Sequence, residues 1–173
     1  MRQRKISCTL DPKSIDQAIQ DLNDWKVNWL EDRCHKLLVE LTNTGAFWAR
    51  THFGNAVYDG DRTVKVYFEE RGDDAFAVIA MGKSAVFIEF GSGVRYPDDH
   101  PLAHSMGMFR GMYGAGKGGS PKGWTYYGEP GSHGKRLRDG VYRTYGNPAN
   151  QCMYRTMQEL RENFEKIARR IFQ

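Results

Sequence analysis

The stretch from residue 153 to residue 171, Met-Tyr-Arg-Thr-Met-Gln-Glu-Leu-Arg-Glu-Asn-Phe-Glu-Lys-Ile-Ala-Arg-Arg-Ile, carries the clearest structural signal in the sequence. Apolar side chains recur in it at intervals of four and three residues, which predicts an amphipathic helix of about six turns. The helix is expected to begin at Asn147, which Pro148 follows, or at Asn150. Its apolar face is expected to pack on the protein's own sheet, with a partner helix or groove as the alternative. The apolar positions are Met153, Met157, Leu160, Phe164, Ile167 and Ile171.

A longer helix is predicted near the N-terminus, where Asp11 followed by Pro12 is typical of a helix start. Apolar residues then follow helical spacing, but the phase slips near Trp25. The slip predicts either one bent helix or two helices, and the end is expected at residues 43–45 or at residues 53–54.

Two strands are predicted between these helices. Residues 63–71 alternate between apolar and polar side chains, and residues 76–81 form a second apolar run, so the pair is expected to be a hairpin. Residues 83–90 fit either a short helix or a third strand. The side chains of the first strand that are expected to face inward are Val64, Val66 and Phe68. These elements predict an α+β fold, with both helices packed on a small, mainly antiparallel sheet.

The 173 residues are expected to form a single domain with an extended arm or insertion at about residues 95–146. This stretch has no convincing helical or strand period, and loops of such length are usually functional. It holds 12 of the 19 glycines. It also holds eight basic and four acidic residues, which leaves 17 basic and 17 acidic residues elsewhere, so the net charge of +4 belongs to the arm.

The arm mixes basic and aromatic side chains, which suits two kinds of partner: a neighbouring subunit or the nucleic-acid backbone. A passive surface loop is the third interpretation. The candidate subunit-interface residues are Phe109, Tyr113, Trp124, Tyr126, Tyr127 and Tyr142. The candidate DNA contacts are Arg110, Lys117, Lys122, Lys135, Arg136 and Arg138.

Familiar catalytic and cofactor motifs are incomplete. Residues 111–118 resemble a phosphate-binding loop, but Gly118 stands where that loop needs serine or threonine, and no helix is predicted to follow. His100 and His104 lack a third ligand, and Pro101 follows His100 where a zinc-protease helix has glutamate. Asp59 and Asp61 are interpreted as turn residues. We therefore expect no catalytic residue, no metal and no cofactor.

Glu89 is a lone carboxylate inside an apolar run, just before a turn that contains Gly91 and Gly93. It could cap a backbone amide, pair with a basic residue or act in catalysis. We interpret Glu89, Gly91 and Gly93, together with Asn147 and Pro148, as a structural motif.

The sequence shows neither a long apolar segment nor a hydrophobic signal region after its basic start. No membrane association is expected. The three cysteines are widely separated, which favours free thiols in a reducing compartment such as the cytoplasm.

Several segments taken in order resemble a family of tailed-phage proteins. They are Phe87-Ile-Glu-Phe-Gly-Ser-Gly-Val94, Tyr96-Pro, His100-Pro, Gly107-Met, Tyr113-Gly, Gly116-Lys, Trp124-Thr-Tyr-Tyr-Gly-Glu-Pro-Gly131 and Thr144-Tyr-Gly-Asn-Pro-Ala-Asn150. The family is the gene-product-ten-like family of siphophages, related to tail protein Z of phage lambda. The resemblance covers nearly the whole chain. The sequence departs from the family pattern at Gln151-Cys152, where the family often has a proline.

The resemblance implies a structural virion protein, not an enzyme. Such a protein forms a ring, hexameric to match tail symmetry, at the neck where the tail joins the DNA-filled head. The implied partners are other copies of the chain, head-completion or connector proteins, tail-terminator or tail-tube proteins, and genomic DNA through non-specific contact. The implied location is the virion, after assembly in the host bacterial cytoplasm. A phage DNA-binding or DNA-processing accessory protein is the alternative.

Overall fold

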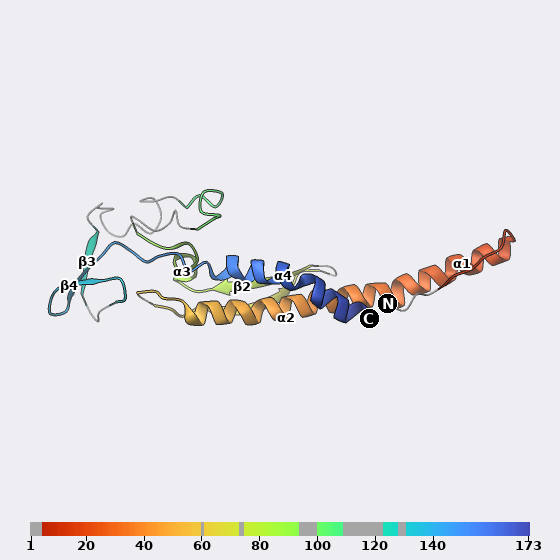
Figure 1. Cartoon of the computed structure of the whole chain (residues 1–173), viewed down its shortest axis with the longest axis horizontal. Helices are drawn as coiled ribbons and strands as arrows, with labels where there is room; N and C mark the ends of the chain where they lie inside the picture. Colours follow the sequence, from red (N-terminus) through yellow and green to blue (C-terminus); the bar gives the residue numbers. More distant parts are fainter. Residues whose placement is uncertain (1–4, 60, 73–74, 94–99, 109–122, 128–130) are drawn as a thin grey trace.

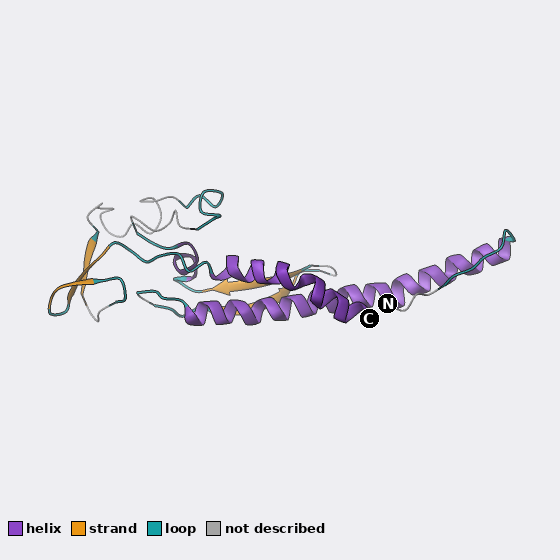
Figure 2. Ribbon diagram, in the orientation of Figure 1, coloured by secondary structure: helices purple, strands orange, loops and turns teal. Residues whose placement is uncertain are grey.

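The computed structural model describes residues 5–59, 61–72, 75–93, 100–108, 123–127 and 131–173. It is an α+β structure with long helices and two separate antiparallel sheets, which confirms the predicted fold class (Figures 1 and 2). None of the helices in these ranges is long and apolar enough to cross a membrane.

Residues 12–55 form one continuous helical rod of three segments. Helix α1 (Pro12–Trp25) runs into a π-helical turn, η1 (Lys26–Glu31), and then into α2 (Asp32–Asn55). Asp11 caps α1 by accepting a hydrogen bond from the Ser14 backbone nitrogen, and Pro12 is the first helical residue, as predicted. The π turn lies where the apolar phase slips, because its wider backbone turn absorbs the mismatch within an unbroken helix.

The first sheet is a hairpin of β1 (Lys65–Glu70) and β2 (Phe76–Met81), and it packs against α2. Val66 is buried, and Phe68 lies on the same face, opposite Val78, which packs against the core. Phe68 nevertheless keeps 47% of its surface exposed, so this face is not buried along its whole length. A two-stranded hairpin offers each side chain few neighbours, and alternation alone does not bury every second residue.

Helix α4 (Cys152–Phe172) lies alongside α2, and α2 also contacts the hairpin. Small residues of α2 allow this close approach. A Cβ atom on Gly45 would lie 3.0 Å from Leu160 Cδ1 and 3.3 Å from Val78 Cγ2. The apolar stripe of α4 is wider than its buried face, since Phe164 stays 49% exposed.

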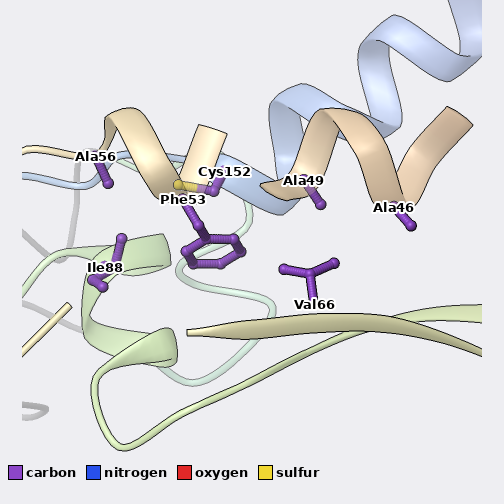
Figure 3. Close-up of a cluster of buried hydrophobic side chains, with 7 residues drawn as sticks. All are labelled: Ala46, Ala49, Phe53, Ala56, Val66, Ile88 and Cys152. Carbon is purple, nitrogen blue, oxygen red and sulfur yellow. The ribbon is translucent and has the colours of Figure 1, made fainter. Parts of the chain in front are cut away.

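The core lies where α2, the hairpin, α3 (Ala85–Phe90) and the start of α4 meet (Figure 3). Ile88 from α3 and Cys152 from α4 are almost fully buried there. Residues 83–90 thus contribute a short helix rather than a third strand. The cluster consists of Ala46, Ala49, Phe53, Ala56, Val66, Ile88 and Cys152.

The second sheet lies at the end of the molecule opposite α1 (Figure 1). Its strands are β3 (Trp124–Tyr127), β4 (Lys135–Arg138) and β5 (Val141–Thr144), and β5 is central. The expectation that residues 95–146 are irregular throughout is therefore wrong for residues 124–127, 135–138 and 141–144. Strands of four residues are too short for an alternating pattern to stand out.

Candidate functional site: the junction of Glu89 and Asn147

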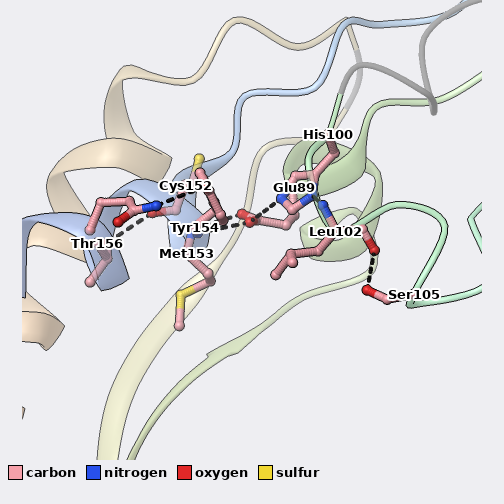
Figure 4. A network of polar contacts seen from close by, with 9 residues as sticks. Glu89, His100, Leu102, Ser105, Cys152, Met153, Tyr154 and Thr156 are labelled. Atoms are coloured by element: carbon pink, nitrogen blue, oxygen red, sulfur yellow. Dashed lines mark hydrogen bonds and ion pairs between the residues drawn. The ribbon is translucent and has the colours of Figure 1, made fainter. Parts of the chain in front are cut away.

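Glu89 joins α3 to the start of α4. Its Oε2 accepts a hydrogen bond from the Met153 backbone nitrogen at 2.7 Å, and its Oε1 accepts one from the Tyr154 nitrogen at 3.0 Å (Figure 4). These amides belong to the first turn of α4, where backbone N–H groups lack partners within the helix. Glu89 therefore caps α4, and the positive end of the helix dipole stabilises the buried carboxylate.

The capping role was predicted for Asn147 or Asn150, and that prediction is wrong. The residue before α4 is Gln151, which has a left-handed backbone with φ of 55° and makes no capping hydrogen bond with its side chain. The cap comes instead from Glu89 of α3. The backbone carbonyl of Glu89 accepts a hydrogen bond from the Gln151 nitrogen at 3.1 Å, and this contact holds the Glu89 side chain over the start of α4.

His100 completes the environment of Glu89. Its Nε2 donates to Glu89 Oε1 at 3.0 Å, and its Nδ1 accepts from the Leu102 backbone nitrogen at 3.0 Å. The second bond requires an unprotonated Nδ1, so the imidazole carries its proton on Nε2. The ring also lies against Phe90, with centroids 4.3 Å apart. His100 is 3% exposed and Glu89 is 7% exposed, so both groups are shielded from solvent.

An apolar pocket of about 310 Å³ borders this pair. Methionine side chains from two segments, Met106 and Met153, line it together with Leu102 and Phe90. Its polar lining residues are Glu89, His100 and Tyr154, which already hold hydrogen bonds. The pocket therefore suits an apolar side chain better than a polar substrate.

Asn147 and Asn150 hold a different segment, the chain that follows α2. Asn150 brackets Val57, accepting from its nitrogen at 2.9 Å and donating to its carbonyl at 3.0 Å. Asn147 Oδ1 accepts from the Asp59 nitrogen at 2.7 Å. The two asparagines thus pair with backbone groups as a neighbouring strand would.

Asp59 extends this network to the second sheet. Its carboxylate accepts hydrogen bonds from the backbone nitrogens of Ser132 and of His133, the latter at 2.6 Å. Residues 131–134 precede β4, so Asp59 ties the three-stranded sheet to the body of the molecule. The sequence predicts only a turn at Asp59. Its bond to Ser132, 73 residues away, leaves no pattern among the residues next to Asp59.

Gly93 and Gly146 let two chain segments cross in close contact. Gly93 has φ of +89° and Gly146 has φ of +110°. A Cβ atom on Gly146 would overlap the Ser92 carbonyl, and one on Gly93 would lie 2.7 Å from Gly146 Cα. The Ser92 nitrogen donates to the Asn147 carbonyl at 2.9 Å, and the Asn147 nitrogen donates to Ser92 Oγ at 3.2 Å. The residues singled out around Glu89, Gly91 and Gly93 therefore meet those around Asn147 and Pro148.

The candidate interface and DNA residues are distributed unevenly. Phe109, Arg110, Tyr113, Lys117 and Lys122 lie outside the described residues. Trp124 and Tyr126 belong to β3, where Tyr127 is 77% exposed. Tyr142, in β5, is only 8% exposed and contributes to the packing of its own chain. Of the basic candidates, Lys135, Arg136 and Arg138 are exposed on β4, and Arg136 pairs with Asp139.

The cysteines and histidines form no metal site in the described ranges, where no group of three or more potential ligands occurs. Cys8, Cys34 and Cys152 are free thiols. Comparison with protein-family models, curated proteins and solved structures gives no match.

Proposed function

We propose that this chain is a structural virion protein of a tailed bacteriophage that forms a ring at the neck. The ring, a hexamer matching tail symmetry, completes the tail and joins it to the DNA-filled head. Its partners are further copies of itself, head-completion or connector proteins on one side, and tail-terminator or tail-tube proteins on the other. The virion is its final location, after assembly in the host cytoplasm.

One observation carries this proposal: two segments of the resemblance, residues 87–93 and 144–150, pack against each other through backbone contacts. Gly93 in the first segment lies far in sequence from Gly146 in the second, yet the two glycines meet where the segments cross. The segments that resemble the phage family therefore build the frame of the fold, which supports a shared architecture.

A non-catalytic role agrees with the chemistry of the Glu89–His100 pair. A glutamate beside a histidine at a pocket is the arrangement that an enzyme would require. Here, however, Glu89 accepts three hydrogen bonds and both nitrogens of His100 are engaged. A proton-transfer group needs a free site facing its substrate, so we assign this pair to holding α3, α4 and residues 100–102 together.

The test is a phage or prophage genome in which an early stop codon interrupts this gene. We expect full heads and full-length but unattached tails in the lysate, visible by negative-stain electron microscopy, and infectivity restored by a plasmid copy. Normal particles from the interrupted genome would contradict the neck assignment.

The alternative, a DNA-binding accessory protein, is favoured by the exposed basic side chains of β4 and β5. It predicts duplex binding by the isolated protein that weakens steeply with salt, since such binding releases counterions. Fluorescence anisotropy with a labelled duplex at 50 and about 200 mM salt measures this.

A further inference from the structure

Helix α1 presents an apolar stripe that its own chain covers only in part. Ile15, Ile19 and Leu22 follow one another at intervals of four and three residues, so they share one face. Their side chains are 39%, 53% and 53% exposed, and no residue of α1 is buried. An amphipathic helix with an exposed apolar face is a typical protein-interaction element.

The charge of α1 narrows the choice of partner. Together with its cap, the helix carries four aspartates and one lysine, a net charge of −3. Helical geometry places Asp16 on one flank of the stripe and Asp21 on the other. Two such helices would repel each other, so the charge favours a basic partner.

A basic surface is present at the opposite end of the molecule, on one face of the β3–β5–β4 sheet. Arg143 pairs across the sheet with Lys135, and Val141 pairs with both Tyr127 and Arg138. Cross-strand partners lie on the same face. A register irregularity between Arg136 and Arg138 places Arg138 opposite Val141, so these side chains share one surface. We call Tyr127, Lys135, Arg138 and Arg143 the basic sheet face.

The basic sheet face is available for a partner. All four of its side chains are exposed. Its three cations form no ion pair with any residue that the structure describes, whereas Arg136, on the other face, is paired with Asp139. Among the residues that the structure describes, the face therefore offers three positive charges without an acidic partner, around an exposed tyrosine.

We propose that α1 of one copy docks on the basic sheet face of the next copy. Asp16 and Asp21 would lie opposite the cations of the face, and the apolar stripe would cover Tyr127. The two surfaces lie at opposite ends of one chain, so only another copy can bring them together (Figure 1). A contact between two different surfaces repeats from copy to copy and closes into a ring when the rotation allows. The inference rests on the proposed ring and names the surfaces that build it.

A second copy fits both surfaces better than DNA does. Phosphates would neutralise the cations, but they would leave the stripe of α1 without a partner. The acidic helix matches the face in both charge and apolar character, because Asp16 and Asp21 flank the apolar stripe and the face carries three cations.

The test reverses charge on each surface separately. The variant Asp16→Lys/Asp21→Lys makes both surfaces basic, and Arg138→Glu/Arg143→Glu makes both acidic. At low salt, each variant alone should associate roughly 100-fold more weakly than the wild type, since like charges would face each other. An equimolar mixture should restore assembly, because each altered surface then meets an opposite charge. Sedimentation velocity gives the masses, and a misfolded variant would not be rescued by mixing.

Controls carry the same type of charge reversal, at one residue each, on the opposite faces. Asp24→Lys lies across α1 from the stripe, and Arg136→Glu lies on the other sheet face. Each should assemble within about fivefold of the wild type. Zero-length carbodiimide cross-linking of the wild type should join Lys135 of one copy to Asp16 or Asp21 of another, which mass spectrometry identifies.

Three results would overturn the proposal: a wild type that stays monomeric, reversed variants that assemble normally, or a mixture that stays dissociated. If Arg138→Glu/Arg143→Glu loses only duplex DNA binding, the face belongs to DNA instead. Electron microscopy of the particles made when this gene is interrupted tests the neck role independently. If the charge-reversed variants still assemble into a ring, the proposed contact is wrong but the proposed neck role is not affected.

Discussion

The carboxylate of Glu89 caps the last helix at Met153, with its Oε2 2.7 Å from the Met153 backbone nitrogen across 64 residues of sequence. A helix that begins at a left-handed glutamine, without a cap of its own, thereby depends on a residue of α3. The same carboxylate holds His100, so one buried charge fixes three chain segments.

Replacing Glu89 with glutamine should destabilise the protein. The amide keeps the size of the side chain, but it offers one acceptor oxygen and no charge to two backbone amides and an imidazole. We expect the free energy of unfolding to fall by about 2–4 kcal/mol. Urea unfolding followed by circular dichroism measures the change. The control Glu69→Gln removes an exposed carboxylate beside Arg71 and should cost less than about 1 kcal/mol. Equal losses in the two variants would contradict the capping role.

Asp59→Ala should loosen the three-stranded sheet more than the rest of the molecule. The substitution leaves the Ser132 and His133 amides without their acceptor. We expect these two amides to exchange at least about tenfold faster, with a loss of about 1–3 kcal/mol in unfolding free energy. Hydrogen exchange read by NMR tests this locally. Asp61→Ala, which removes a bond only to nearby Thr63, should leave both exchange rates unchanged.

Gly146→Ala should be far more damaging than Gly107→Ala. Both glycines have positive φ, 110° and 71°, so both variants bear backbone strain. Only at Gly146 would the new methyl group overlap a neighbouring backbone, whereas at Gly107 no atom lies within 4 Å. We expect a loss of about 3 kcal/mol or more at Gly146 and about 1 kcal/mol at Gly107. Thermal unfolding compares them, and similar melting temperatures would contradict the close crossing.

The Cys152 thiol should make stability depend on alkaline pH. Burial, with the Glu89 carboxylate nearby, raises the pKa of Cys152 from its ordinary value of 9.0 to about 12. Above pH 9 the unfolded chain loses this proton while the folded chain keeps it, so the contribution is complete below pH 9 and disappears as pH rises toward 12. In that window, the unfolding free energy of the wild type should fall relative to Cys152→Ala by up to about 1.4 kcal/mol per pH unit.

Urea titrations of both proteins between pH 8 and pH 10.5 measure this difference. Alkylation gives an independent check, because iodoacetamide should label exposed Cys8 and Cys34 rapidly and Cys152 only after unfolding. A difference that stays constant with pH, or rapid labelling of all three thiols, would show that Cys152 is not shielded.

Local signals predicted the helices well. Asp11 and Pro12 marked the start of α1, and the phase slip near Trp25 marked the π turn. These features depend on neighbours within a few residues. The short strands β3, β4 and β5 were missed because four residues give too little alternation to detect.

The site was predicted less well, because its contacts span long distances in sequence. Asn147 and Asn150 are good helix caps by type, but they bind backbone groups at Val57 and Asp59 about 90 residues away. The pairing of Glu89 with His100 likewise depends on how α3 and the following loop fold back. Residue type indicated that these positions form hydrogen bonds, while only the tertiary structure determines their partners.

The π turn at Lys26–Glu31 also sets the direction in which α1 presents its stripe. An α-helix rotates about 100° per residue, so removing one residue from this turn would turn the whole of α1 about its axis by roughly that angle. The buried face of α2 would stay in place while Ile15, Ile19 and Leu22 swung toward a different neighbour. The length of the π turn thus determines which way the apolar face of α1 points. A change of one residue there rotates this helix without altering the core.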